Sequence, residues 1–276
     1  MSKPLVSVNI CTWRPQQAYF SAAVQSILDQ TFSDYEVIIV EDPSEIDGKA
    51  LLGDLIKDPK IHYIQNSQRT GLLEQKNQAL KLSRGEFVAI LDHDDVAIPE
   101  RLERQVEFLL KHPEICVVGS WIRAIDALGK PIGIRKYPTH PSEIRAALRR
   151  FSPIAHPASM FRKQCVAEIG GYTWRHRVDP LGLVSDYDLW CRLARAGYDM
   201  SNIPEVLLDY RIHTNAQKKL TVRSFILATI IIKWRYLKNE FCASDWVRFF
   251  AELGLLFLPS ALVWQVFWRV TYKRAI

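Results

Sequence analysis

Regular alternation between strand-like and helix-like segments over residues 5–112 constrains the fold more than any other feature of this sequence. The strand-like segments are short, apolar and rich in β-branched residues, whereas the segments between them carry apolar residues at helical spacing. Strands are predicted at residues 5–10, 35–42, 61–66 and 86–91, and helices at 22–30, 49–58, 72–82 and 99–112. This alternation is typical of an α/β fold in which helices cover both faces of a mostly parallel, Rossmann-like sheet.

The pattern loosens after about residue 115. Further strands are predicted at residues 115–126, 158–162 and 206–213, and a helix at 185–197. A chain of 276 residues has room for one large domain with an appendage. We therefore predict a domain over residues 1–213, with halves 1–115 and 116–213, followed by a helical tail over residues 214–276.

Polar residues follow each predicted strand of the first half. They are "CTWR" at 11–14, Glu41 with Asp42, "NSQRTG" at 66–71 and "DHDD" at 92–95. Ligands bind at the carboxyl ends of the strands in such sheets, so these residues are expected to share one binding edge. The first turn, "CTWRPQQ", contains no glycine, and the chain has no Walker A sequence. A bound nucleotide would therefore need another positive partner for its phosphates.

The "DHDD" segment can recruit that partner. If the segment is extended, Asp92 and Asp94 project to one side and His93 to the other. Neighbouring carboxylates repel one another unless a cation matches them, and carboxylates suit Mg²⁺ or Mn²⁺. Helix capping does not explain them, because Pro99 is expected at the first helical position and Ile98 at the cap. A metal site is predicted, with a plain surface turn as the alternative.

The charge distribution separates the tail from the rest of the chain. Residues 213–276 carry ten basic and three acidic residues, a net charge of +7, whereas residues 1–212 carry −1. A nucleic-acid-binding protein usually spreads basic residues over its folded face, so that class is not favoured. The five cysteines form no CxxC pair, and residues 1–10 do not resemble a signal peptide. We expect a reduced, cytoplasmic protein.

The tail is apolar, basic and aromatic at once. Residues 249–268 are nearly all apolar but include Glu252 and Pro259, and four of the eight tryptophans lie in the tail. Twenty residues could just span a bilayer, but the internal Glu and Pro suit helices that lie in the membrane interface. The alternative is a helical appendage packed on the main domain. The interface hypothesis places the protein peripherally at the inner face of the cell membrane.

Several motifs, taken in order, resemble the family 2 glycosyltransferases, which have the GT-A fold. They are "VSVNICTW", "SILDQTFSDYEVIIVED", "GLLEQKNQALKLSRGEFVAILDHDDVAIPERLERQVEFL" and "SDYDLWCRLARAG", and the resemblance runs from about Leu5 to His213. It implies a nucleotide-binding half (1–115) and an acceptor half (116–213). It also implies inverting, Mn²⁺- or Mg²⁺-dependent transfer of a sugar from a nucleotide-diphosphate sugar, by family frequency a UDP-sugar. The acceptor would be a hydroxyl group, and the basic tail suggests a lipid-linked or cell-surface glycan precursor.

The resemblance also implies roles for residues at the donor end. Asp42 matches the acidic residue that contacts the nucleobase, and Trp13 with its neighbour Thr12 lies where an aromatic residue packs on the base. Asp92 matches the first Asp of the family's DxD motif, near the ribose. His93 is retained as a donor-side candidate, although alternation turns it aside. The chain departs from the usual "PTYN" and "DDGS", with "CTWR" and "EDPS" in their places.

Four further residues receive roles in the transfer step. Asp94 matches the metal-binding Asp of the DxD motif, and His213 resembles a late His near the metal or diphosphate. Lys76 falls where the family often has an Arg that contacts the diphosphate. Asp186 matches the Asp of the "ED" motif, the expected catalytic base, and Ser185 replaces the preceding Glu.

Each of these residues also has a structural interpretation. Ser185 could cap the helix that follows and Asp188 could complete a capping box, and the helix dipole would lower the pKa of Asp186. A lone His is more often a satisfied polar residue than a ligand, which applies to His213 and to His156, a weaker acceptor-side candidate. Trp13 taken alone would be a core aromatic residue.

Two other functions are compatible with the same pattern. A sugar-phosphate nucleotidyltransferase could use a similar sheet, but it would need a basic, glycine-rich loop after the first strand, where "CTWRPQQ" offers only Arg14. A non-catalytic, membrane-recruited nucleotide-binding protein could keep the metal site without turnover.

Overall fold

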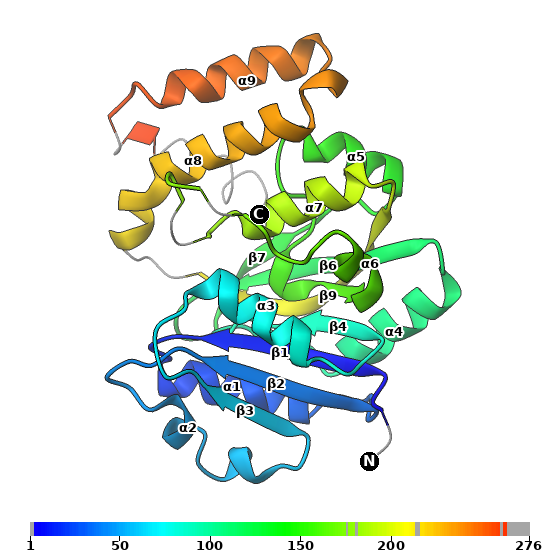
Figure 1. Cartoon of the computed structure of the whole chain (residues 1–276), viewed down its shortest axis with the longest axis vertical. Helices are drawn as coiled ribbons and strands as arrows, with labels where there is room; N and C mark the ends of the chain where they lie inside the picture. The colour runs from blue at the N-terminus through cyan, green and yellow to red at the C-terminus, as the bar shows by residue number, and fades with distance from the viewer. Residues whose placement is uncertain (1–2, 175, 180–181, 213–215, 260–261, 264–276) are drawn as a thin grey trace.

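A nine-stranded sheet lies at the centre of the protein, and helices pack on both of its faces (Figure 1). The computed structural model describes residues 3–174, 176–179, 182–212, 216–259 and 262–263. The strands are β1 (Val6–Thr12), β2 (Tyr35–Glu41), β3 (Ile61–Gln65), β4 (Phe87–Ile90), β5 (Val96–Ala97), β6 (Ile115–Ile125), β7 (Pro131–Arg135), β8 (Met160–Arg162) and β9 (Asp199–Arg211). Their order is β3-β2-β1-β4-β8-β6-β9-β5, with β7 paired to β6.

The helices follow the predicted pattern, with three differences in the first half, the first being a helix that begins at Gln17 instead of residue 22. The α-helices are α1 (Gln17–Leu28), α2 (Gly48–Leu51), α3 (Leu72–Leu82), α4 (Arg101–Lys111), α5 (Pro141–Leu148), α6 (Lys163–Glu168), α7 (Ser185–Arg195), α8 (Ala216–Tyr236) and α9 (Ala243–Leu255); short 3-10 helices are η1 (Gly53–Lys57), η2 (His156–Ala158) and η3 (Lys238–Glu240). The helix predicted at 49–58 is split into α2 and η1, because Gly53 has a φ of +55°.

The start of α4 also differs from the prediction. The helix begins at Arg101, with Glu100 as its N-cap residue, so Pro99 is not at the first helical position and Ile98 is not the cap. The Pro99 carbonyl instead accepts a hydrogen bond from the Thr31 backbone N–H at 2.9 Å, which holds the turn before α4 against the end of α1. Asp94 and Asp95 still lie too far upstream to cap α4.

The first half forms the expected parallel sheet. Strands β3, β2, β1 and β4 pair in parallel, and every residue of β2 is buried. Val37 and Ile39 pack into the same cluster as α1, whereas Ile38 and Val40 pack with Ala79 of α3 on the other face. Because alternate side chains of a strand point to opposite faces, helices on both faces explain the continuous apolar pattern of β2.

The second half mixes strand directions, as the looser pattern after residue 115 predicted. Strand β6 pairs in parallel with β9 but antiparallel with β7 and β8. Strand β8 joins the two halves by pairing antiparallel with β4, and β5 pairs antiparallel with β9. Helix α7 packs its buried face, which includes Leu189 and Trp190, into the cluster that contains Val88 of β4 and Phe161 of β8.

The tail is helical where the structure describes it. Helix α8 packs on α7 through Ala228 and Ile232, and α9 lies on the outer side of α8 (Figure 1). Glu252 of α9 accepts hydrogen bonds from the Lys233 ammonium of α8 at 2.7 Å. None of the helices in the described ranges is both long and apolar enough to cross a bilayer. The predicted boundary at residue 213 falls between β9 and α8, and the division into domains stays a prediction.

Candidate active site

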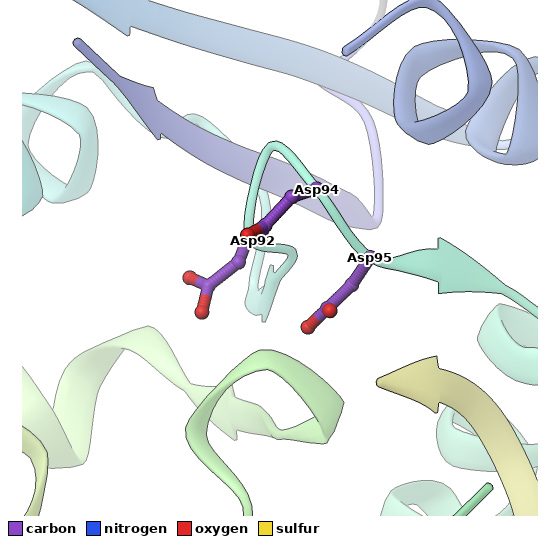
Figure 2. Close-up of side chains that lie close together, drawn as sticks. All are labelled: Asp92, Asp94 and Asp95. Atoms are coloured by element: carbon purple, nitrogen blue, oxygen red, sulfur yellow. The ribbon is translucent and has the colours of Figure 1, made fainter. Parts of the chain in front are cut away.

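A tight turn after β4 gathers three carboxylates at the edge of the sheet. The Asp95 backbone N–H donates to the Asp92 carbonyl at 3.2 Å, so residues 92–95 fold back. Carboxylate oxygens of Asp92, Asp94 and Asp95 lie within 4.8 Å of one another (Figure 2). The expected extended segment, with only Asp92 and Asp94 on one side, is therefore wrong. The chain turns here because β5 begins at Val96 and pairs with β9.

Asp95, expected only to support its neighbours, is the most buried member of the cluster. Only 1% of its surface is exposed, and its Oδ1 accepts a hydrogen bond from the Arg211 backbone N–H at 2.8 Å. Its Oδ2 is buried and makes no hydrogen bond to any residue that the structure describes. Burial raises the pKa of Asp95 well above its ordinary value, and the charges of Asp94 and Asp92 raise it further.

The pKa of Asp92 is also raised by burial and by a neighbouring carboxylate. Burial raises its pKa to about 6, and Asp94 adds to the increase, whereas Lys76 and His93 oppose it. A group of carboxylates with such raised pKa values is short of positive charge, and a bound cation would supply it. Three carboxylates at this spacing are suitable ligands for a hard divalent ion.

Two buried arginines, Arg101 and Arg211, donate hydrogen bonds to backbone carbonyls in or just before the carboxylate turn. The Arg101 guanidinium is 1% exposed and donates from Nη2 to the Ile90 carbonyl at 2.7 Å. Burial lowers the pKa of Arg101 to about 10, although Asp95 and Asp92 oppose the shift. Nothing in the sequence singled out Arg101, because an Arg in an amphipathic helix usually lies on the solvent face.

Arg211, at the end of β9, contacts the turn directly. Its Nε donates to the Asp94 carbonyl at 2.9 Å, and its Nη1 donates to the Asp126 carbonyl at 3.1 Å. The guanidinium also lies over the Tyr19 ring, 4.3 Å from its centroid. Arg211 therefore ties the carboxylate turn to the β6–β7 connection and to α1. The sequence gives no sign of this role, since the partners of Arg211 are more than eighty positions away.

The start of α7 faces this cluster together with Lys76 of α3. The Lys76 ammonium donates to the Ser185 hydroxyl at 3.0 Å. The N-cap residue of α7 is Val184, whose side chain cannot accept a hydrogen bond, so the expected Ser185 cap is wrong. Asp188 does not complete a capping box either, because its carboxylate accepts a hydrogen bond from Arg192 Nε at 2.8 Å.

Asp186 lies half-buried in the first turn of α7. Burial raises its pKa, and the positive charge of Lys76 opposes the shift. The backbone N–H groups of Asp186 and Tyr187 at the helix start do lower this pKa, as expected, but desolvation of the carboxylate is the stronger effect. A raised pKa makes a carboxylate a better proton acceptor, and the role of Asp186 as the base stays a prediction.

A small pocket lies beside Asp92 and Lys76. It lies between β1, β4 and α3, and its lining includes Asn9, Cys11, Lys76, Asp92 and His156. The buried His156 ring shares a hydrogen bond of 2.9 Å with the Tyr172 hydroxyl, and burial lowers its pKa well below the ordinary value, so the ring is neutral. His156 therefore faces the pocket as a neutral polar group.

His93 has a different neighbour. Its ring lies edge-on to Phe20 of α1, with 6.5 Å between the ring centroids. Contact between His93 and a donor stays a prediction.

Asp42 organises the loop after β3. Its carboxylate accepts hydrogen bonds from the Asn66 side chain at 2.9 Å, from the backbone and hydroxyl of Thr70 at 2.9 Å each, and from the Gly71 backbone at 2.7 Å. These four bonds fix residues 66–71 against the ends of β1 and β2. Asp42 is 1% exposed, and all four of these bonds hold the loop in its conformation.

Trp13 lies beside the same loop. Its ring is flanked by the guanidinium groups of Arg14 and Arg69, whose centres lie 4.6 Å and 3.8 Å from the ring centroid. Thr12 is 2% exposed, and its carbonyl accepts a hydrogen bond from Gln75 Nε2 at 2.7 Å. The structure therefore brings Thr12, Trp13 and Asp42 to one end of the binding edge. His213 lies outside the described residues.

The match to a family model decides the identity of the chain. The model described as glycosyl transferase family 2 matches residues 7–170, which include the three carboxylates and Lys76. The chain belongs to glycosyl transferase family 2. Asp186 of this glycosyltransferase lies beyond the matched range, so its role does not rest on the family model.

Curated relatives extend the similarity over most of the chain. This glycosyltransferase is 31% identical over 265 residues to an uncharacterized glycosyltransferase of Methanocaldococcus jannaschii, covering 92% of this chain and 88% of the relative. It is 32% identical to an O-antigen biosynthesis glycosyltransferase of Escherichia coli, covering 86% and 90%. An E. coli UDP-Gal:alpha-D-GlcNAc-diphosphoundecaprenol beta-1,3-galactosyltransferase is 26% identical, covering 91% and 90%. Relatives of the enzyme thus act in polysaccharide biosynthesis.

Solved structures confirm the fold. A mannosyltransferase from Pyrobaculum calidifontis, solved in complex with GDP-Man and Mn²⁺, superposes with a TM-score of 0.64 at 15% identity. The match covers 95% of this glycosyltransferase and 72% of the mannosyltransferase. The GT-A fold expected from the sequence motifs is therefore confirmed.

Proposed function

We propose that this glycosyltransferase moves a sugar from a nucleotide-diphosphate sugar, a UDP-sugar, to a hydroxyl group of a lipid-linked or cell-surface polysaccharide precursor, with inversion at the anomeric carbon. One observation carries the proposal: Asp92 of the carboxylate cluster and Lys76 line one pocket, and Asp186 is near enough for its charge to raise the pKa of Asp92. The UDP-Gal donor and diphosphoundecaprenol-linked acceptor in the name of the E. coli relative support the choice of donor and acceptor.

The carboxylate cluster fits a divalent metal ion. Asp95 Oδ2 is buried without a hydrogen-bond partner among the described residues, and Asp92 and Asp94 place further carboxylate oxygens beside it. We assign Mn²⁺ or Mg²⁺ to Asp94, with Asp92 beside the ribose and His213 as a further expected ligand. When bound, such an ion neutralises the charge that develops on the leaving nucleoside diphosphate. The Mn²⁺ in the similar mannosyltransferase supports this assignment.

The remaining donor contacts follow the polar ends of the strands. Lys76 is close enough to Asp92 to lower its pKa, so its ammonium can also hold the diphosphate in place. We expect Trp13 to pack on the nucleobase, with Thr12 and Asp42 beside it, and the Arg69 guanidinium 3.8 Å from its ring centroid must then move aside. We assign these residues to donor binding, and Asp42 acts there both on the base and through the loop that it holds.

Asp186 acts as the catalytic base in this proposal. Its carboxylate accepts the proton of the acceptor hydroxyl as that oxygen attacks the anomeric carbon, and the bond from this carbon to the diphosphate oxygen breaks. Attack and departure occur on opposite faces of the sugar, which inverts the configuration. The raised pKa of Asp186, caused by its burial, supports a role in accepting a proton.

The alternative of a sugar-phosphate nucleotidyltransferase has weaker support. Arg14, the basic residue of the turn after β1, donates from Nε to Glu45 at 3.0 Å, and Trp13 packs against it. This arrangement does not provide a basic, glycine-rich cradle for a triphosphate. Release of pyrophosphate from a nucleoside triphosphate would favour this alternative.

A thermal-shift screen of nucleotide sugars with and without Mn²⁺ tests the proposal. We expect one donor to stabilise the protein only when the metal is present, and Asp94→Ala to abolish that stabilisation. Asp186→Asn should keep the donor-induced shift but reduce sugar transfer by about 100-fold or more. Metal-independent stabilisation by every nucleotide would refute the metal site. Donor binding without turnover, unchanged in Asp186→Asn, would favour the non-catalytic binding protein.

A further inference from the structure

The outer face of α9 carries an apolar stripe that no neighbouring helix covers among the described residues. Ala243, Val247, Phe250 and Gly254 recur at helical spacing on this face, Phe257 and Leu258 follow the end of the helix at Leu255 and complete the stripe, and each of these residues is exposed. Val247 is 71% exposed and Phe250 61%, and the nearby Phe257 is 88% exposed. Large apolar side chains exposed next to one another are typical of an interaction site, whereas scattered single apolar residues are not.

The inner face of α9 already has its partners. Phe249 is buried in a cluster with Ile226 and Ile230 of α8. Helix α9 is therefore apolar on two sides, and only one of them serves to attach the tail to the enzyme. Because α9 forms the outermost layer beyond α8, its second apolar side points away from the body of the protein (Figure 1).

The acidic residues of α9 are directed inward. The Asp245 side chain is 1% exposed and pairs with Arg149 Nε at 2.8 Å, and Glu252 pairs with Lys233 Nζ at 2.7 Å. In contrast, the exposed charged residues in the described part of the tail are mostly basic, and the exposed acidic residue Glu240 is outnumbered by them. Those exposed and described basic residues of the tail are Arg223, Arg235, Lys238 and Arg248. The outside of the tail is thus apolar and cationic.

Trp234 adds a feature typical of a membrane boundary. It is 48% exposed, lies beside Trp246 with ring centroids 6.2 Å apart, and is covered on one side by the Lys238 ammonium, 4.6 Å from its centroid. Tryptophan prefers the headgroup region of a bilayer, where its ring is half in water and half in hydrocarbon.

We propose that the outer face of α9 docks the enzyme onto an anionic lipid surface. Val247, Phe250 and Phe257 of the stripe enter the interface, and the exposed basic residues of the tail contact the headgroups. A second copy of the chain is a poorer partner, because a two-fold symmetric contact would bring the same cationic face against itself. The proposal concerns attachment only and is independent of the donor and acceptor proposed above.

Vesicle co-sedimentation of the full-length protein tests this docking surface. The vesicles contain phosphatidylcholine alone or phosphatidylcholine mixed with phosphatidylglycerol. We expect binding to the anionic vesicles, weakened by added salt, and an about tenfold or greater loss of binding in the triple variant Val247→Ser, Phe250→Ser, Phe257→Ser. Leu128→Ser is the matched control, since Leu128 is 94% exposed in the β6–β7 connection and should not affect binding.

Two checks keep the test decisive. Far-UV circular dichroism and any nucleotide-induced thermal shift should be the same for the triple variant and the wild type, which separates loss of docking from loss of folding or of donor binding. Absence of vesicle binding by the wild type, or equal binding by the triple variant, would overturn the proposal. A concentration-dependent dimer that the triple variant abolishes, without vesicle binding, would also overturn it and assign the stripe to a second copy.

Discussion

Replacing Arg211 by Met should destabilise the enzyme through the carboxylate turn. The guanidinium donates to the carbonyls of Asp94, Asp126 and Ala127 at 2.9, 3.1 and 3.3 Å and lies 4.3 Å from the Tyr19 ring centroid. Three hydrogen bonds from a charged donor and one cation–π contact are lost, and the positive charge beside the three carboxylates disappears. Met retains much of the apolar contact, so we expect a loss of about 3 kcal/mol in the free energy of unfolding.

Arg104→Met provides a control at another ion pair of β9. Arg104 of α4 pairs with Glu205 of β9 at 3.8 Å, and because both side chains are 51% exposed, such a pair contributes about 1 kcal/mol or less. Urea denaturation of both variants, followed by circular dichroism, compares the two losses directly. Equal losses, or a loss below about 1 kcal/mol for Arg211→Met, would refute the conclusion that Arg211 holds the turn.

Three further predictions concern other buried carboxylates. Asp42→Asn replaces a charged acceptor of four hydrogen bonds by a neutral amide and should lower the free energy of unfolding by about 2 kcal/mol in urea denaturation; a Thr70→Val variant, which removes one of these bonds, should lose less. Asp95→Asn should leave the metal-free protein as stable as the wild type or more so, because it removes a buried charge repelled by its neighbours, yet abolish stabilisation by Mn²⁺ in a thermal-shift assay; strong destabilisation without metal would contradict this. Although burial raises the pKa of Asp245, hydrogen bonds from Cys242 and Arg149 outweigh it and hold the pKa at about 2. Because the pKa of Asp245 is lower in the folded than in the unfolded protein, its charge stabilises the fold above about pH 4, and this stabilisation is lost as the pH falls towards 2. The free energy of unfolding, measured by urea denaturation, should therefore fall by about 2 kcal/mol over this range in the wild type but not in Asp245→Asn.

The parallel half of the fold was predictable because its signals are local. The β-branched run of β2 indicates a strand buried on both faces, and the buried alternation of Ile38 and Ile39 towards α3 and α1 confirms it. Polar strand ends then place Thr12, Asp42 and Asp92 at one edge by topology alone, whereas Lys76 was singled out by the family resemblance. The sequence motifs were sufficient for the family and the GT-A fold, both of which the comparisons confirm.

The errors occurred where distant parts of the chain determine local shape. The 92–95 segment was expected to be extended, but β5 pairs with β9 more than a hundred residues later and forces a turn. Ser185 was expected to cap α7, but its hydroxyl accepts a hydrogen bond from Lys76, which comes from the other half. Arg101 and Arg211 gave no sequence signal, since a buried arginine cannot be told from an exposed one until its carbonyl partners are known.

The hydrogen bonds from Arg211 to the carboxylate turn have a consequence for how the enzyme is assembled. The backbone and guanidinium of Arg211 reach Asp95 and Asp94 from the far end of β9, the last strand among the residues that the structure describes. During synthesis the four parallel strands can form early, but the three carboxylates cannot take up their final positions until residue 211 has emerged and β9 has entered the sheet. A fragment that ends at residue 115 would carry every acidic residue of the cluster and still lack the geometry to hold an ion. In this enzyme a residue far beyond position 115 therefore completes the carboxylate turn.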